Sequence, residues 1–232
     1  MNNHKEEQLL RKMIEFLAQE AGESLEVEGK TVEELKTLWR GFVNVRQPKG
    51  SPAEYVTFEN EYLQEYHAPR VQTLADCLST PNDQIKLYYG DLCELKVDAI
   101  VNAANSEMLG CFIPNHRCID NAIHTFSGIQ LRSFCHHLME EQGKKVTPLR
   151  EQLLAGCYKS CLEAAREAGL TSIAFCGIST GEFGFPKEPA ARIAMDTVNK
   201  WLQDTSSTMT VVFSTYTKED QSIYQKLLSG EQ

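Results

Sequence analysis

Two cysteines and one histidine, Cys111, His116 and Cys118, fall within a segment of eight residues. Thiolate sulfur and imidazole nitrogen are ligands that zinc favours, and three protein ligands leave a fourth position for water or substrate. The segment follows an apolar run, Val97 to Val101, that is predicted to be a buried strand. Ligands bind beyond the carboxyl ends of strands in open α/β sheets. A zinc site is therefore one interpretation; on spacing alone, two ordinary buried thiols and a surface histidine remain the other.

A carboxylate follows the last of these candidate ligands by two residues. Asp120 lies near the predicted start of a helix, where it could act as a general acid or base. The helix dipole favours a carboxylate at this position for structural reasons as well. A helix-capping role is therefore the competing interpretation.

Two further segments follow predicted strands. Gly177 to Pro186 is rich in glycine and hydroxyl groups, and it matches neither the Walker pattern nor the dinucleotide fingerprint. Its backbone N–H groups suit an anion and Phe183 could stack on a sugar, although an ordinary strand–helix connection explains the composition too. Asp91 follows a strand through Gly90 and could accept a hydrogen bond from the amine of a base; a turn carboxylate is the alternative.

The elements that must position these residues follow from hydrophobic periodicity. The first third of the chain is predicted to be helical, and strands then alternate with helices, which indicates a mainly parallel sheet covered on both faces. The Thr31–Glu34 capping-box pattern opens one helix, and Ser51 and Pro52 are expected at the N-cap and first position of the next. The predicted strands are 85–89, 97–102, 172–176 and 210–214, and the helices of the second part are 118–143, 147–169, 188–202 and 218–228.

Composition limits the classes of function. The chain has 232 residues, a net charge of −9 and no run rich in lysine or arginine, which argues against nucleic acid as a partner. A small anionic ligand is not excluded, because backbone amides can hold a phosphate. We expect no membrane span and no secretion signal, and eight cysteines without such a signal favour a cytoplasmic location.

Taken together, these segments resemble the macrodomain family, and within it the zinc-containing protein-ADP-ribose hydrolases. The resemblance extends in ordered blocks over nearly the whole chain, including the helical leader around Leu38–Arg46. The matching blocks are Gly90–Leu92, Val97–Asn105, Cys111–His124 and Ile178–Phe183.

The resemblance implies a three-layer α/β/α macrodomain with a mainly parallel mixed sheet at residues 81–232, after a helical N-terminal extension at 1–80. It implies hydrolysis of the bond between ADP-ribose and a protein side chain, with ADP-ribose and the ADP-ribosylated protein as partners and one zinc per chain. A reader module that binds ADP-ribose without cleaving it, or a purely structural metal loop, are the alternatives. The resemblance assigns Cys111, His116 and Cys118 to zinc, and Asp120 and Asn105 to catalysis. It assigns Asp91 and Tyr216 to adenine and Asn105 to the distal ribose. The diphosphate would contact Ser179, Thr180, Gly181, Glu182 and Phe183, and further ADP-ribose contacts would come from Leu92, Cys118, Ile119 and Asp120.

The chain departs from the family at one point. Macrodomains usually carry two more strands between the helix ending near Gly143 and the helix beginning near Thr147. Here Glu141 to Val146 runs directly into Thr147 and Pro148. Either this edge of the sheet is deleted, or residues are missing from the sequence at this point.

Overall fold

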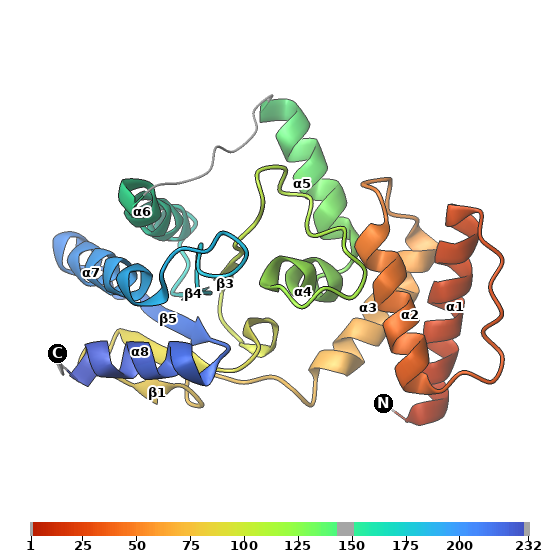
Figure 1. Ribbon diagram of the computed structural model, residues 1–232, viewed down its shortest axis with the longest axis horizontal. Coiled ribbons are helices and arrows are strands. Elements are labelled where there is room, and N and C mark those ends of the chain that lie inside the picture. Colours follow the sequence, from red (N-terminus) through yellow and green to blue (C-terminus); the bar gives the residue numbers. More distant parts are fainter. Residues whose placement is uncertain (1, 143–150, 230–232) are drawn as a thin grey trace. The chain divides into compact units, whose positions relative to one another are not determined.

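Figure 1 shows the computed structural model of the chain, which describes residues 2–142 and 151–229. Helices come first and strands then alternate with helices, as the sequence predicts. The elements are α1 (Asn3–Ala21), α2 (Val32–Val45), α3 (Ala53–His67), β1 (Leu78–Ser79), β2 (Ile85–Tyr89), the 3₁₀ turn η1 (Leu92–Glu94), β3 (Ala99–Val101), α4 (Ile119–Phe126), α5 (Ile129–Gln142), α6 (Glu151–Glu167), β4 (Ser172–Phe175), α7 (Lys187–Thr205), β5 (Thr210–Thr215) and α8 (Lys218–Ser229).

The residues fall into two compact units. The first unit contains Met1–Arg70 and Ala104–Thr147, and the second contains Val71–Ala103 and Pro148–Gln232. The predicted domain border between residues 80 and 81 stays a prediction, because grouping by contacts does not test which segments fold alone.

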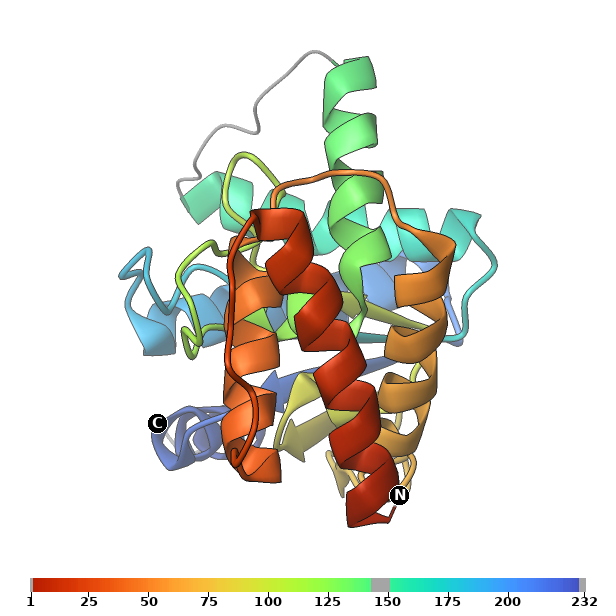
Figure 2. The ribbon, with the colours of Figure 1, turned by 90° about the vertical axis from the view of Figure 1, so that its right-hand side faces the viewer.

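The core of the first unit lies among α1, α2 and α3, which run side by side in Figures 1 and 2. Trp39 of α2 packs edge-on against Tyr62 of α3 with 5.0 Å between the ring centroids. The Trp39 indole N–H donates to the Tyr55 hydroxyl at 3.1 Å, so its polar atom is satisfied inside the core. Burying each such side chain stabilises the fold by about 1.5–3 kcal/mol. The other buried members of this core are Leu9, Leu10, Met13, Ile14, Leu17, Leu35, Val43, Leu63 and Ile129.

Local signals set the start of α2 but not that of α3. The predicted capping box is confirmed: the Glu34 amide donates to Thr31 Oγ1 at 3.3 Å, and the Glu34 carboxylate accepts from the Thr31 amide at 2.8 Å. The N-cap predicted at Ser51 is wrong, because Pro52 occupies that position and α3 begins at Ala53. The Ser51 hydroxyl instead donates to Ser133 Oγ at 3.4 Å.

The single helix predicted for residues 118–143 is also wrong, since α4 ends at Phe126 and α5 begins at Ile129. Between them Gly128 has φ of +80°, in the left-handed region that favours glycine. A Cβ atom at Gly128 would lie 2.7 Å from Glu59 Oε2. That oxygen accepts the Ile129 amide at 2.8 Å. A carboxylate from α3 therefore both requires the glycine and caps α5.

Glu59 gives the unfolding free energy a dependence on pH. Its side chain is 1% exposed, and burial raises its pKa from 4.5 to about 7. Between these values the folded protein binds more protons than the unfolded chain, so stability falls as pH rises from 4.5 to 7. We expect Glu59→Gln to remove this dependence. As the pH rises from about 5 to about 8, the free energy of unfolding of the variant should come to exceed that of wild type by up to about 3 kcal/mol. Urea denaturation at both pH values measures it.

The exposed Glu15, with the same substitution to glutamine, is the matched control and should follow wild type at both pH values. Parallel curves for wild type and Glu59→Gln would show that burial of this carboxyl has no energetic consequence.

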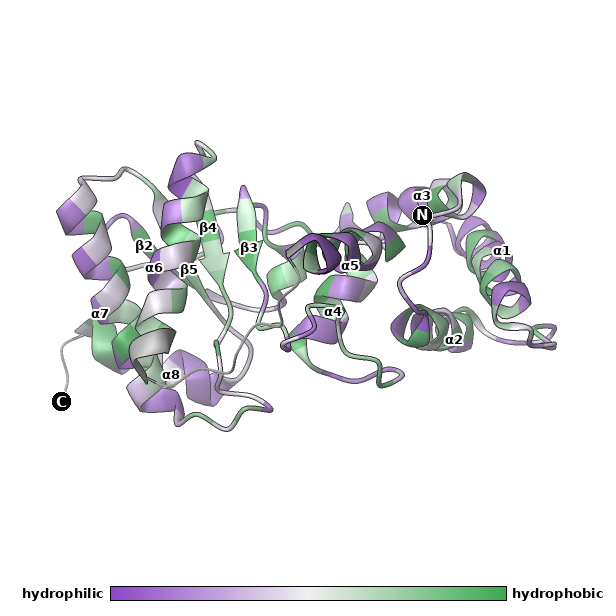
Figure 3. Ribbon diagram, turned by 90° about the horizontal axis from the view of Figure 1, so that it is seen from above, coloured by the Kyte–Doolittle hydropathy of each residue, from purple (hydrophilic) through white to green (hydrophobic). Residues whose placement is uncertain are grey.

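The second unit is built on a five-stranded sheet in the order β1-β2-β5-β4-β3. The four strands after β1 are parallel to one another and β1 pairs antiparallel with β2, so the sheet is mixed but mainly parallel, as predicted. The edge strand β3 and its buried neighbour β4 are coloured largely as hydrophobic in Figure 3. Tyr158 of α6 packs against Phe175 of β4 and Phe213 of β5, and α8 packs against β2 and β5. The architecture is the three-layer α/β/α arrangement that the resemblance implies.

The strand predicted at 97–102 is shorter, because only Ala99–Val101 pair with β4. Asp98 forms side-chain bonds instead. Its Oδ2 atom accepts from the Thr171 amide at 2.8 Å and the Ser172 amide at 2.9 Å, which fastens the beginning of β3 to the beginning of β4. The two-residue strand β1 was not predicted, since two residues show no periodicity. Within the described ranges, no helix has the length and apolar character needed to cross a membrane.

Candidate functional site

Three of the predicted binding segments lie at one edge of the sheet in the second unit. β2, β5 and β4 are neighbouring parallel strands, with Tyr89 paired to Thr215 and Phe175 to Phe213. Asp91, Tyr216 and the 179–183 loop each follow the carboxyl end of one of these strands. Ligands in open α/β sheets bind at this edge. The structure therefore brings these predicted residues to one place in the fold.

The 177–186 loop holds a compact turn of its own. Ser179 has φ of +66°, and its carbonyl accepts the Phe185 amide at 2.9 Å. The Thr180 hydroxyl donates to the Gly177 carbonyl at 3.0 Å. These bonds close the loop on itself.

Closing the loop leaves several of its backbone donors unused. Within the described part of the chain, the amides of Ser179, Thr180, Gly181 and Phe183 donate to no other residue. Phe183 is 60% exposed and Tyr216 is 74% exposed, so both rings are accessible to a ligand. Consecutive free amides form the kind of concavity that binds anions.

Asp91 also has a structural role in the turn after β2. It is the N-cap of η1, and its Oδ1 accepts the Cys93 amide at 2.9 Å. The turn-carboxylate interpretation is therefore correct for one carboxylate oxygen. Leu92 beside it is 2% exposed, and its contact with ADP-ribose stays a prediction.

The three candidate metal ligands lie together in the first unit. The sulfur atoms of Cys111 and Cys118 and a ring nitrogen of His116 all lie within 4.8 Å of one another. The Cys111 sulfur is 3.4 Å from His116 Nδ1. Cys135, on α5, does not belong to this cluster. Among the described residues, no other group of three or more such side chains meets the same criterion.

The 3.4 Å between the Cys111 sulfur and the His116 nitrogen is close to the separation expected of two zinc ligands. With Zn–S near 2.3 Å and Zn–N near 2.0–2.1 Å, tetrahedral geometry places sulfur and nitrogen about 3.6 Å apart and two sulfurs about 3.8 Å apart. Burial raises the pKa of the Cys118 thiol, and the neighbouring Cys111 raises it further. A bound dication would offset both effects, because it stabilises thiolates.

Asp120 lies in the first turn of α4, two residues after Cys118. The N-cap position belongs to Cys118, whose sulfur accepts the Asn121 amide at 3.4 Å. Asp120 is therefore not the N-cap residue of α4. Asp120 is 6% exposed, and its Oδ1 lies 3.6 Å from His124 Nε2.

Two residues lie beside this carboxylate: His124, which the sequence offered only as a possible fourth metal ligand, and Arg132, which it did not single out. Burial lowers the pKa of His124 to about 4, so the imidazole is neutral at pH 7. Burial also lowers the pKa of Arg132, to about 10, and Asp120 acts against that decrease. Among described residues, His124 Nδ1 and Arg132 Nε and Nη2 have no hydrogen-bond partner. The His124 ring packs against the backbone of Gly110, which only a glycine allows, since a Cβ atom at that position would lie 2.7 Å from His124 Cγ.

Arg132 also fixes the end of α2. Its Nη1 donates to the carbonyls of Val43, Asn44 and Arg46 at 2.9, 3.1 and 2.6 Å. Nothing in the sequence pattern of α5 indicated this role, because the acceptors lie more than 80 residues earlier.

Asn105 holds the loop before the metal ligands. Its Nδ2 donates to the Gly110 carbonyl at 3.1 Å, and its Oδ1 accepts the Glu107 amide at 3.0 Å. Ile119 is the half-buried first residue of α4. Ribose contact by Asn105 and ADP-ribose contact by Ile119 stay predictions.

Comparison with known proteins identifies the family. The Macro domain family matches residues 101–149 and 144–194 of this chain. A protein-ADP-ribose hydrolase of Treponema medium is 41% identical over 231 residues, covering 85% of this chain and 88% of the relative. The chain belongs to the macrodomain family. This macrodomain is also 38% identical to a protein-ADP-ribose hydrolase of Staphylococcus aureus strain MRSA252, with 86% of each chain covered.

Solved structures agree with the family. A Trypanosoma brucei macrodomain in complex with ADP-ribose has a TM-score of 0.61 and 28% identity, covering 81% of this macrodomain and 94% of that chain. An Oceanobacillus iheyensis macrodomain has a TM-score of 0.58 and 29% identity, covering 63% and 90%. The predicted macrodomain resemblance and fold class are confirmed.

The predicted departure from the family, between Val146 and Thr147, lies outside the described residues. The two segments that match the family overlap at residues 144–149, which include that point. Its structural consequence for the sheet stays a prediction.

Proposed function

We propose that this macrodomain hydrolyses the bond between ADP-ribose and a modified protein side chain. The observation that carries the proposal is the position of Asp120, a buried carboxylate that follows the Cys111–His116–Cys118 cluster directly. The names of its relatives as protein-ADP-ribose hydrolases support the same reaction.

Binding would rest on groups of the second unit. The amides of Ser179, Thr180, Gly181 and Phe183 suit a diphosphate, since backbone N–H groups stabilise an anion without a charged side chain. One oxygen of Asp91 is engaged by the Cys93 amide, and the other suits the exocyclic amine of adenine. Tyr216 and Phe183 are exposed aromatic rings that suit stacking.

The chemical step calls for a positioned water. Cleavage of a glycosidic bond passes through an oxocarbenium-like state. A nucleophile must attack the sugar carbon of that state from a defined face. We assign Asp120 to orienting and deprotonating that water. Arg132 then balances the charge of the carboxylate, and His124, neutral at pH 7, lies beside it and helps to orient it.

Cys111, His116 and Cys118 would hold one zinc ion. When bound, zinc supplies Lewis-acid polarisation of an oxygen and favours ionisation of water near neutral pH. The protein residues then fix where that oxygen lies.

We also propose that the protein is located in the cytoplasm.

The test of the proposed function is the release of ADP-ribose from ADP-ribosylated protein by the wild-type enzyme, followed in a time course. Release that depends on enzyme concentration supports the hydrolase. Tight binding of ADP-ribose without release supports the reader module instead.

Metal content tests the ligand assignment. We expect about one zinc per chain in protein purified without added metal, and a large loss of zinc in the Cys118→Ala variant. Elemental analysis measures both. Cys161→Ala is the control, because Cys161 is a free thiol of α6 outside the cluster. Zinc near zero in wild type, or full retention in Cys118→Ala, would remove this site.

A further inference from the structure

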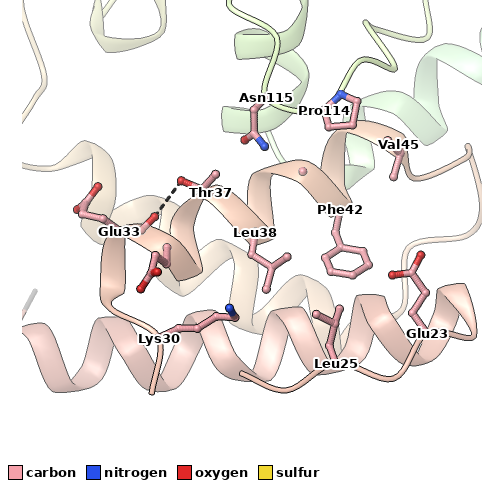
Figure 4. Close-up of a pocket in the computed structure, with 12 residues that line it drawn as sticks. Glu23, Leu25, Lys30, Glu33, Thr37, Leu38, Phe42, Val45, Pro114 and Asn115 are labelled. Carbon is pink, nitrogen blue, oxygen red and sulfur yellow. Dashed lines mark hydrogen bonds between the residues drawn. The ribbon is translucent and has the colours of Figure 1, made fainter. Parts of the chain in front are cut away.

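The proposed hydrolysis does not use a pocket of about 660 Å³ in the first unit. The pocket lies along α2, against the connection from α1 to α2 and two residues of the loop before α4. In Figure 4, Leu38 and Phe42 point from α2 toward Leu25 of that connection. The volume is in the range of pockets that bind small ligands or side chains.

The lining of the pocket is mainly apolar. Leu25, Leu38 and Phe42 are half-buried, so each keeps part of its surface open to the pocket. Val45, one helical turn beyond Phe42, is 42% exposed, and Pro114 is exposed. Such a surface gains free energy when an apolar side chain covers it.

The rim carries negative charge. Glu23, Glu33 and Glu34 line the pocket, with Lys30 as the lining cation. Figure 4 places Glu23 and Glu33 at opposite ends of the pocket. Residues 20–34 together hold six glutamates and one lysine. Glu20 is paired with Arg46 at 2.7 Å and Glu33 with Lys36 at 2.8 Å, so the segment stays net negative after these pairs are counted. This surface attracts a cationic partner and repels a free diphosphate.

The pocket shares a wall with the candidate metal loop. Pro114 and Asn115 line it, and both lie between Cys111 and His116 in the sequence. The Asn115 amide donates to Asn44 Oδ1 of α2 at 2.8 Å, which holds this part of the loop against the helix. A chain segment seated in the pocket therefore lies beside the loop that carries the proposed chemistry.

We propose that this pocket docks the protein part of the substrate, through an apolar side chain flanked by lysine or arginine. The inference rests on the proposed function and adds a substrate preference to it. The apolar side chain covers Leu38, Phe42 and Val45. The cationic neighbours meet Glu23, since Glu33 is paired with Lys36 and the Glu34 carboxylate is held in the capping box. ADP-ribosylated proteins that carry such a segment near the modified residue are the preferred substrates.

Peptide calorimetry tests the docking without catalysis. The probe is a hexapeptide of alternating lysine and leucine, compared with one of lysine and serine and one of glutamate and leucine. Only the first is expected to bind, more weakly at high salt. Glu23→Lys and Val45→Ser should each weaken its binding about tenfold.

Matched controls separate this pocket from general surface effects. Glu15→Lys makes the same charge change on an exposed position of α1. Val71→Ser removes an equally exposed valine, since Val71 is 43% exposed and Val45 is 42% exposed. Both controls should bind the peptide as wild type does. Equal binding by all five proteins, or no binding by wild type, overturns the proposal.

Kinetics then connect docking with turnover. On an ADP-ribosylated protein whose modified residue has lysine and leucine neighbours, Glu23→Lys and Val45→Ser should raise KM with kcat unchanged. On an ADP-ribosylated peptide without these neighbours, both variants should match wild type. An unchanged KM on the first substrate overturns the docking role while wild-type turnover still upholds the hydrolase. A change of sedimentation coefficient in Val45→Ser would show that a second copy covers the pocket, which also overturns it.

Discussion

An Asp120→Ala enzyme should lose hydrolase activity by about 10²–10⁴-fold while its affinity for ADP-ribose changes at most a few fold. The reason is that a group that orients or deprotonates water contributes mainly in the transition state. Release of ADP-ribose from modified protein, together with calorimetry of free ADP-ribose, measures the two quantities separately.

Two further variants sharpen the assignment. Asp91→Ala should weaken ADP-ribose binding by about 1–3 kcal/mol, because the adenine amine loses its acceptor. Asp196→Ala, at an exposed position of α7, should change neither quantity. If Asp120→Ala instead melts earlier while the folded fraction stays fully active, Asp120 is structural and the catalytic assignment fails.

Arg132→Met should lower the free energy of unfolding by about 3–5 kcal/mol. The substitution removes a buried cation and leaves the carbonyls of Val43, Asn44 and Arg46 without this donor. A cation at the carboxyl end of a helix is also favoured by the helix dipole, so α2 loses this stabilisation as well. Urea denaturation of wild type and variant measures the difference.

Arg192→Met is the matched control for this loss. Arg192 is an exposed residue of α7 whose ion pair with Glu188 spans one helical turn, and such pairs contribute little. Its change in stability should stay within about 0.5 kcal/mol. A similarly small change in Arg132→Met would show that solvent or neighbouring groups replace the lost bonds.

The parts of the fold that could be predicted are those with a local cause. The capping box at Thr31 and Glu34 spans four residues, and the apolar strands carry their own pattern. The clustering of Cys111, His116 and Cys118 was equally accessible, since the three residues are close neighbours in the sequence.

The errors come from partners that are distant in the sequence. Glu59 breaks the predicted long helix from 70 residues away. Arg132 meets its acceptors from more than 80 residues away, so neither its burial nor its role beside Asp120 has a signature in α5. Ser51 failed as an N-cap for a related reason, because Ser133 offers its hydroxyl another partner.

The two ways of capping a helix in the first unit have a consequence for the order of folding. α2 carries its capping groups within its own first turn, so this end can form before any distant contact. The cap of α5 comes from Glu59, and it becomes available only after a long loop has closed, at a cost in chain entropy. Substitutions at Thr31 should therefore slow folding, whereas Glu59→Gln should mainly change the unfolding rate, a contrast that Φ-values from stopped-flow kinetics measure.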